Sequence, residues 1–74
     1  MYMELKRDIL KLYSRGEQKK SYTLRGISGL TADDISNLLT YCGLYEREGE
    51  IAEGWKERVT SPKMADVLIK YGMW

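Results

Sequence analysis

Few side chains in this sequence are suited to catalysis, because it contains no histidine and a single cysteine. The adjacent carboxylates Asp33 and Asp34 are the best candidates for a metal site. Neighbouring side chains on a helix point about 100° apart, however, so this pair does not converge on one ion. Both residues fit the start of a helix, where carboxylates bind backbone amides and interact favourably with the helix dipole. A glycine-rich phosphate-binding loop is also missing, and we expect neither an enzyme nor a metal or other cofactor.

The length of the chain bounds its organisation. Its 74 residues leave room for one hydrophobic core, so we expect a single domain over residues 1–74. Cys42 has no partner for an internal disulfide and lies on the apolar side of a predicted helix, which indicates a small buried hydrophobic residue. No apolar run reaches the roughly 18 residues of a membrane span, and no signal peptide is recognisable. The expected location is the cytoplasm, without a membrane partner.

Charge is distributed unevenly, although the net charge is only +1. Residues 4–20 carry six positive and three negative side chains, whereas residues 21–74 carry six positive and eight negative ones. From Gly26 to Glu46 there is no lysine or arginine. The N-terminal third is therefore mildly basic, but far less so than a strong nucleic-acid-binding domain.

Apolar residues recur at helical spacing in the first segment. They fall at i, i+4 and i+7 and predict an amphipathic helix over residues 3–15, ended by Gly16. A polar loop follows, and "YTL" is at most a short strand. Thr23 then offers an N-cap for a brief helix over residues 24–28, which Gly29 closes. The apolar positions of the first helix are Leu5, Ile9 and Leu12.

Thr31 is the predicted N-cap of the next helix. Its hydroxyl can accept a hydrogen bond from the backbone amide of Asp34, and the Asp34 carboxylate can bind back to the cap amide, as in a capping box. Gly43 is expected to end this helix. Its apolar stripe consists of Ile35, Leu38, Leu39 and Cys42.

The last third of the chain is expected to form a hairpin and a helix. Residues 45–60 have strand-like spacing, with Gly49 and Gly54 as candidate turn positions. Ser61 is the expected N-cap of the final helix, and Pro62 takes the first helical position, where its missing N–H costs nothing.

The aromatic residues and the C-terminal tail bear on self-association. Because the chain has no phenylalanine, some tyrosines must fill the core, and we expect Tyr13 and Tyr71 there. Tyr41 and Tyr45 are expected in more exposed positions. Gly72 ends the final helix and leaves an apolar tail that either folds back onto the core or contacts another chain. The candidate contact residues of a homodimer are Met73 and Trp74.

The predicted order of elements is helix, short strand, short helix, helix, hairpin and helix, which resembles the winged helix-turn-helix superfamily. The resemblance rests on "YTLRGISGLTADDISNLL" as the two-helix unit and on "CGLYERE" as the exit into the wing. The run "VTSPKMADVLIKYG" into the final helix also looks like small YjcQ-type winged-helix proteins of prophages. The resemblance implies an α+β, mainly α fold with three N-terminal helices, a β-hairpin wing and a C-terminal helix. It also implies a DNA-binding transcriptional regulator or prophage accessory factor.

A DNA-binding member of this superfamily would insert the exposed side of the helix over residues 31–43 into the major groove. Asn37 could there read adenine. The carboxylates of Asp33 and Asp34 oppose this, because DNA affinity depends on cations that release counterions from phosphates. Two hypotheses remain, namely duplex DNA binding that is weak or needs a dimer, and a protein-interaction module without DNA binding. The nucleic-acid-binding candidates are Arg25, Asn37, Thr40, Tyr41, Arg47, Lys56 and Arg58.

Overall fold

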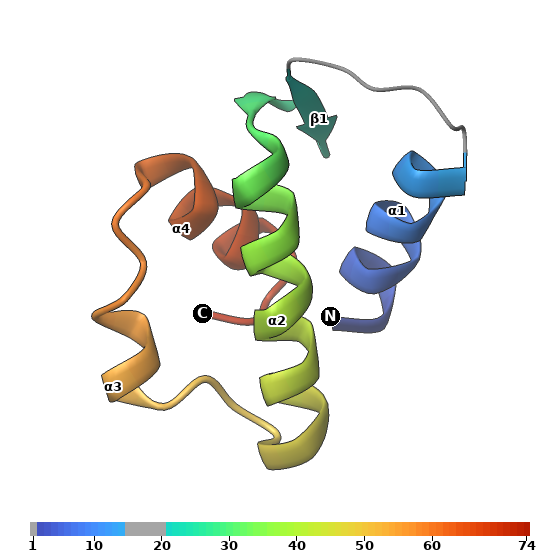
Figure 1. The fold of residues 1–74 in the computed structure, drawn as a ribbon. Coiled ribbons are helices and arrows are strands. Elements are labelled where there is room, and N and C mark those ends of the chain that lie inside the picture. Colours follow the sequence, from blue (N-terminus) through green and yellow to red (C-terminus); the bar gives the residue numbers. More distant parts are fainter. Residues whose placement is uncertain (1, 15–20) are drawn as a thin grey trace.

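The computed structural model describes residues 2–14 and 21–74 and is a small, mainly helical α+β domain. The long helix α2 lies between α1 and α4, and α3 lies at the opposite end of the molecule from the hairpin (Figure 1). The predicted stop at Gly16 falls outside the described residues. The elements are α1 (Tyr2–Ser14), β1 (Tyr22–Leu24), β2 (Ile27–Leu30), α2 (Ala32–Glu48), α3 (Glu53–Lys56) and α4 (Pro62–Lys70).

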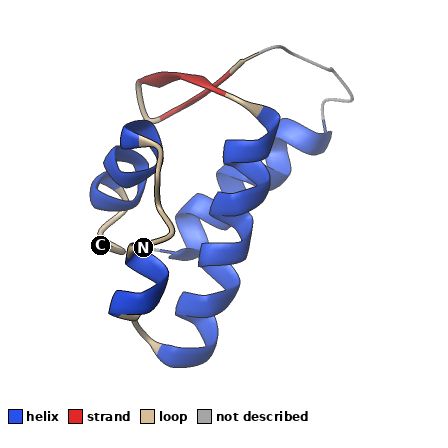
Figure 2. Ribbon diagram, turned by 60° about the vertical axis from the view of Figure 1, so that its left-hand side comes forward, coloured by secondary structure: helices blue, strands red, loops and turns tan. Residues whose placement is uncertain are grey.

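An antiparallel hairpin stands where the brief helix over residues 24–28 was expected, so that prediction is wrong. Leu24 pairs with Ile27, and the two residues between them, Arg25 and Gly26, have φ of 47° and 83°. Two central residues with positive φ are typical of tight two-residue hairpin turns, because their twist matches that of the strands. Figure 2 shows the two strands at one end of the helices, with β2 leading directly into α2.

The capping box at the start of α2 is confirmed. The Thr31 hydroxyl accepts a hydrogen bond of 3.1 Å from the backbone N–H of Asp34. The Thr31 N–H in turn donates to the Asp34 carboxylate over 3.0 Å. The two groups satisfy each other's unpaired polar atoms and fix the first residue of the helix.

Gly43 does not end α2, contrary to the prediction, and the helix continues to Glu48. The stop is Gly49, which has φ of 75° and donates its N–H to the Tyr45 carbonyl over 2.7 Å. A glycine inside a helix costs only about 1 kcal/mol relative to alanine. The residues after Gly43 continue to bury apolar surface, since Leu44 is 4% exposed. That burial outweighs the local preference of Gly43 for a helix end.

The hairpin predicted over residues 45–60 is also wrong, because this stretch forms the end of α2, a turn and α3. Gly54 lies inside α3 rather than in a strand turn. Ile51 is buried, and Trp55 packs against the core with part of its surface exposed. Ile51 lies in the connection before α3 and Trp55 within it, so their apolar spacing does not come from a strand. The winged-helix order expected for this segment is therefore not observed, since the strands precede α2.

The C-terminal helix begins at Pro62 as predicted, although the Ser61 side chain forms no capping hydrogen bond. Beyond it, the N–H of Gly72 binds the Ile69 carbonyl over 3.0 Å, and the N–H of Met73 binds the Leu68 carbonyl over 2.9 Å. This pair of bonds is a Schellman motif, with Gly72 at φ 73°. The motif turns the tail back against the domain.

The hydrophobic core lies where α1, α2, α4 and the hairpin meet. Tyr71 is buried as predicted, but Tyr41 is also buried, at 4% exposure, and Tyr13 is 48% exposed, so those two predictions are wrong. Tyr13 lies on the outer side of α1, whereas its neighbour Leu12 packs against the core. The buried residues are Leu5, Ile9, Leu24, Leu30, Ile35, Leu38, Tyr41, Cys42, Leu44, Ile51, Met64, Val67, Leu68, Tyr71 and Met73.

Candidate functional site

Four of the seven predicted nucleic-acid-binding residues come together around one small cavity. The cavity has a volume of about 160 Å³ and opens between α2, the α3 segment and the start of α4. Its lining residues are Asn37, Thr40, Tyr41, Trp55, Arg58 and Met64. Asn37 and Thr40 are exposed beside it on α2, as expected from the sequence.

Tyr41 holds α3 against α2 and has little surface left for a ligand. Its hydroxyl donates a hydrogen bond of 2.7 Å to the Trp55 carbonyl. Its ring meets the indole of Trp55 edge to face, with centroids 6.1 Å apart. Burial raises the pKa of the Tyr41 phenol, so the group stays protonated and keeps donating. The expected exposure of Tyr41 is therefore wrong, and its buried side chain offers little surface to a base or a phosphate.

Two of the predicted phosphate-binding cations lie on aromatic rings. The guanidinium of Arg58 is 4.4 Å from the centre of the Trp55 ring, and the ammonium of Lys56 is 5.3 Å from the centre of the Trp74 ring. Such cation–π contacts contribute about 0.5–1 kcal/mol at exposed sites. Arg47, by contrast, is exposed in the last turn of α2 and does not belong to this cluster.

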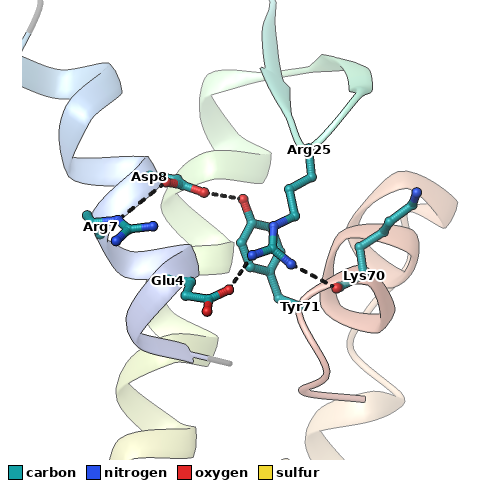
Figure 3. Close-up of polar contacts among 6 residues, drawn as sticks. All are labelled: Glu4, Arg7, Asp8, Arg25, Lys70 and Tyr71. Carbon is teal, nitrogen blue, oxygen red and sulfur yellow. Dashed lines mark hydrogen bonds and ion pairs between the residues drawn. The ribbon is translucent and has the colours of Figure 1, made fainter.

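Arg25 connects three elements of the fold (Figure 3). Its guanidinium forms an ion pair with Glu4 of α1 and donates to the Lys70 carbonyl at the end of α4 over 3.3 Å. It also lies 4.2 Å from the centre of the Tyr71 ring. The Tyr71 hydroxyl in turn donates to the Asp8 carboxylate over 2.5 Å. Burial and this hydrogen bond raise the pKa of the Tyr71 phenol, and the cluster as a whole holds the hairpin and α4 against α1.

The two residues of the expected homodimer contact, Met73 and Trp74, differ in their burial. Met73 is 3% exposed and belongs to the core, so its role as an intermolecular contact is wrong. Trp74 is 43% exposed and packs on Lys56. Of the two outcomes considered for the tail, folding back onto the core is therefore the one observed for Met73.

A second surface, along α1, was missed by the sequence reasoning. Met3 is 68% exposed and Leu10 is 49% exposed, although both are large apolar residues. They are seven residues apart, which puts them two turns apart on the same side of a helix. They border a cavity of about 490 Å³, which we call the α1 groove. The α1 groove is lined by Tyr2, Met3, Lys6, Arg7, Leu10, Lys11, Ser14 and Glu46.

The α1 groove presents the apolar side chains of Met3 and Leu10 with positive charge between and beside them. Lys6, Arg7 and Lys11 contribute cations, and Glu46 of α2 is the one carboxylate among the lining residues that the structure describes. Lys6 pairs with Glu46 over 3.7 Å, and both side chains are about half exposed. The sequence contains the residues of this surface as a second stripe at helical spacing, i, i+4, i+7 and i+11, beside the core stripe of the same helix. That stripe runs through Met3, Arg7, Leu10 and Ser14.

Neither a redox site nor a metal site is indicated in the part of the chain that the structure describes. Burial raises the pKa of the Cys42 thiol from 9.0 to about 11, which keeps it protonated and unreactive. Within residues 2–14 and 21–74, no three side chains of the metal-ligating types form a cluster that could hold an ion. None of the helices there is long and apolar enough to cross a bilayer.

Comparison with known proteins adds no further assignment. No family model matches this chain, and neither the curated proteins nor the solved structures include one that is significantly similar to it. Any function must therefore be argued from the geometry of the sites themselves.

Proposed function

We propose that this domain is a protein-interaction module that binds its partner through the α1 groove. The observation that carries the proposal is the exposure of Met3 and Leu10 on one side of α1. The side of α1 that faces the core buries Leu5 and Ile9, whereas Met3 and Leu10 lie outside the core cluster. Exposed apolar residues gathered beside a cavity, with polar residues around them, are typical of protein-binding surfaces.

The α1 groove suits a protein better than it suits DNA. A phosphate backbone would not cover Met3 and Leu10, whereas a protein partner would remove their apolar surface from water. Three of the four cations predicted to bind phosphates already lie over aromatic rings, namely Arg25, Lys56 and Arg58.

A differential capture experiment tests this proposal. The wild-type domain, a Leu10→Glu variant and an Ile69→Glu variant are immobilised and exposed to a lysate of the native host. Ile69 is the matched control because it is an aliphatic residue, 57% exposed, on α4 rather than on α1. We expect a protein that is retained by the wild type and by Ile69→Glu but lost from Leu10→Glu. Identical retention by all three, or none by any, would overturn the proposal.

Duplex DNA binding, implied by the winged-helix resemblance, is a second candidate. It is favoured by the exposure of Asn37 and Thr40 together on α2, and opposed by the exposed carboxylate of Asp33 at the start of that helix. Titration of a labelled mixed-sequence duplex at low and moderate salt, followed by anisotropy, tests it. DNA binding requires affinity that falls steeply with salt and a slope reduced by Arg47→Ala with Arg58→Ala. The protein-interaction proposal expects no binding at low salt.

A further inference from the structure

We infer that the partner presents an acidic amphipathic helix to the α1 groove, with a carboxylate placed between two apolar side chains. This inference rests on the proposed protein-interaction function and adds the chemistry of the partner. It follows from the order of residues along the groove, where the cation Arg7 lies between the apolar residues Met3 and Leu10.

The positive charge of the α1 groove favours a partner surface that is negatively charged. Among the described residues that line it, three are cations and one is a carboxylate, and that carboxylate, Glu46, is already engaged by Lys6. Arg7 pairs with Asp8 over 3.8 Å, but Asp8 also accepts the hydrogen bond from Tyr71. A carboxylate of a partner can form a bidentate pair with the Arg7 guanidinium. Such exposed pairs contribute more to specificity and to association rate than to affinity, which leaves Met3 and Leu10 as the apolar anchors.

The shape of the α1 groove favours a helix as its occupant. The lining residues extend from Tyr2 to Ser14 and so follow α1 over its whole length. The two apolar anchors are separated by seven residues, about 10 Å along the axis, which matches the spacing of apolar residues two turns apart on a second helix. Recognition of this type, in which one apolar side of a helix fills a groove, needs anchors at such intervals.

A second copy of this chain does not fit the α1 groove. Two α1 surfaces facing each other would bring the cations Lys6, Arg7 and Lys11 of one copy close to those of the other, and like charges repel. The acidic stretch at residues 46–57 of another copy would supply carboxylates but no apolar anchor. None of the large hydrophobic residues that are exposed in the described part of the chain falls in that stretch; they are Met3, Leu10, Tyr13, Ile69 and Trp74.

An anionic lipid surface is a poorer fit than a helix. Insertion at a membrane interface requires a continuous apolar side with cations at its edges. On α1 the cation Arg7 interrupts the apolar side between Met3 and Leu10. A peptide can place a carboxylate opposite this position, whereas the acyl region of a bilayer cannot.

Two displayed libraries of helical peptides test the inference. Both have apolar residues at i and i+7; one carries Glu or Asp at the intervening and flanking positions, and the other carries Lys or Arg. We expect the wild-type domain to enrich peptides from the acidic library, and Leu10→Glu to enrich none. Enrichment from the basic library instead, or from neither, would overturn the inference.

A charge swap sharpens the test. For an enriched peptide, Arg7→Glu should weaken binding by about tenfold or more, and exchange of the central peptide carboxylate for Lys should restore it in that variant. Lys63→Glu is the matched control and should leave affinity unchanged, because Lys63 is exposed in the first turn of α4 and is not among the residues that line the α1 groove. Equal weakening by both variants, or no rescue by the swapped peptide, would overturn the assignment to Arg7.

The failure of this inference can be told apart from the failure of the proposed function. If a native partner is captured and lost with Leu10→Glu while the acidic library yields nothing, the protein-interaction function stands and the chemistry assigned to the partner is wrong. If the domain instead binds phosphatidylserine-containing vesicles, and Leu10→Glu abolishes that binding, then the protein-interaction function and the chemistry assigned to the partner are both wrong.

Discussion

The guanidinium of Arg25 lies 4.2 Å from the centre of the Tyr71 ring. Figure 3 shows the Arg25 side chain extending from the hairpin and lying over this ring. Tyr71 binds Asp8 of α1 from its hydroxyl end, and Arg25 binds Glu4 of the same helix. Residues from three distant parts of the sequence thus meet around one ring. Arg25 is consequently a structural residue that joins the hairpin to α1 and α4.

Replacing Arg25 by alanine should destabilise the domain by about 1–2 kcal/mol, because a cation–π contact, an exposed ion pair and a hydrogen bond are lost together. Arg47→Ala is the control and should change stability by less than about 0.5 kcal/mol, as expected of an exposed residue without such contacts. Urea denaturation followed by circular dichroism measures both. Equal effects of the two substitutions would contradict the structural role of Arg25.

The two glycines of α2 should respond in opposite ways to alanine. Gly43→Ala should stabilise the domain by about 0.5–1 kcal/mol, because Gly43 is inside the helix and a Cβ there meets nothing within 4 Å. Gly49→Ala should destabilise it by about 1 kcal/mol, because alanine disfavours the φ of 75° found at Gly49. Thermal denaturation of both variants checks the position of the helix end. Destabilisation by Gly43→Ala with a neutral Gly49→Ala would show that α2 ends where the sequence pattern suggested.

Stability should fall as the pH rises above about 9. Burial raises the pKa of the Cys42 thiol from 9.0 to about 11, so the unfolded chain releases this proton first and gains free energy from doing so. The difference between these two pKa values corresponds to stability on the order of 3 kcal/mol, which is lost as the pH rises from 9 to 11. The raised pKa values of Tyr41 and Tyr71 extend the loss above pH 10. Urea midpoints between pH 8 and 11 measure the effect, and Cys42→Ala should flatten the first part of the profile. Midpoints that stay constant over this range would contradict the burial of these groups.

Adjacent residues of α1 should differ sharply in their effect on stability. Ile9 is fully buried, and Ile9→Ala should cost about 2–5 kcal/mol. Leu10 is 49% exposed, and Leu10→Ala should change stability by less than about 1 kcal/mol. Denaturant midpoints of the two variants give the comparison directly. A large loss in Leu10→Ala would mean that the outer side of α1 belongs to the fold and is not available to a partner.

The sequence was sufficient where a short-range hydrogen bond or a single periodicity decides the structure. The capping box of Thr31 and Asp34 needs only two residues three apart, and Pro62 is tolerated at few helical positions other than the first turn. The burial of Cys42 follows from its place on the apolar stripe of α2.

The sequence was insufficient to predict the structure where packing overrides the local preference of a residue. Gly43 and Gly49 are the same residue type, and only the burial of Leu44 beyond Gly43 decides which of them ends α2. The turn at Arg25 and Gly26 was missed because arginine seldom adopts a positive φ without contacts to hold it there. These contacts come from α1 and α4, which are remote in sequence.

The α1 groove was not predicted for a related reason. The apolar stripe through Leu5 and Ile9 was recognised in the sequence of α1, whereas the second stripe, through Met3 and Leu10, was not. Whether Met3 and Leu10 are buried depends on which side of α1 meets α2, and the fold alone decides that.

Calorimetric titration of the captured partner into the wild-type domain, Leu10→Glu and Ile69→Glu tests the central claim most directly. The α1 groove as the binding surface predicts that Leu10→Glu weakens the interaction by about a hundredfold, as expected when a buried apolar anchor is replaced by a charge. It also predicts that Ile69→Glu binds like the wild type. Unchanged affinity of Leu10→Glu, with the domain still folded, would contradict the account.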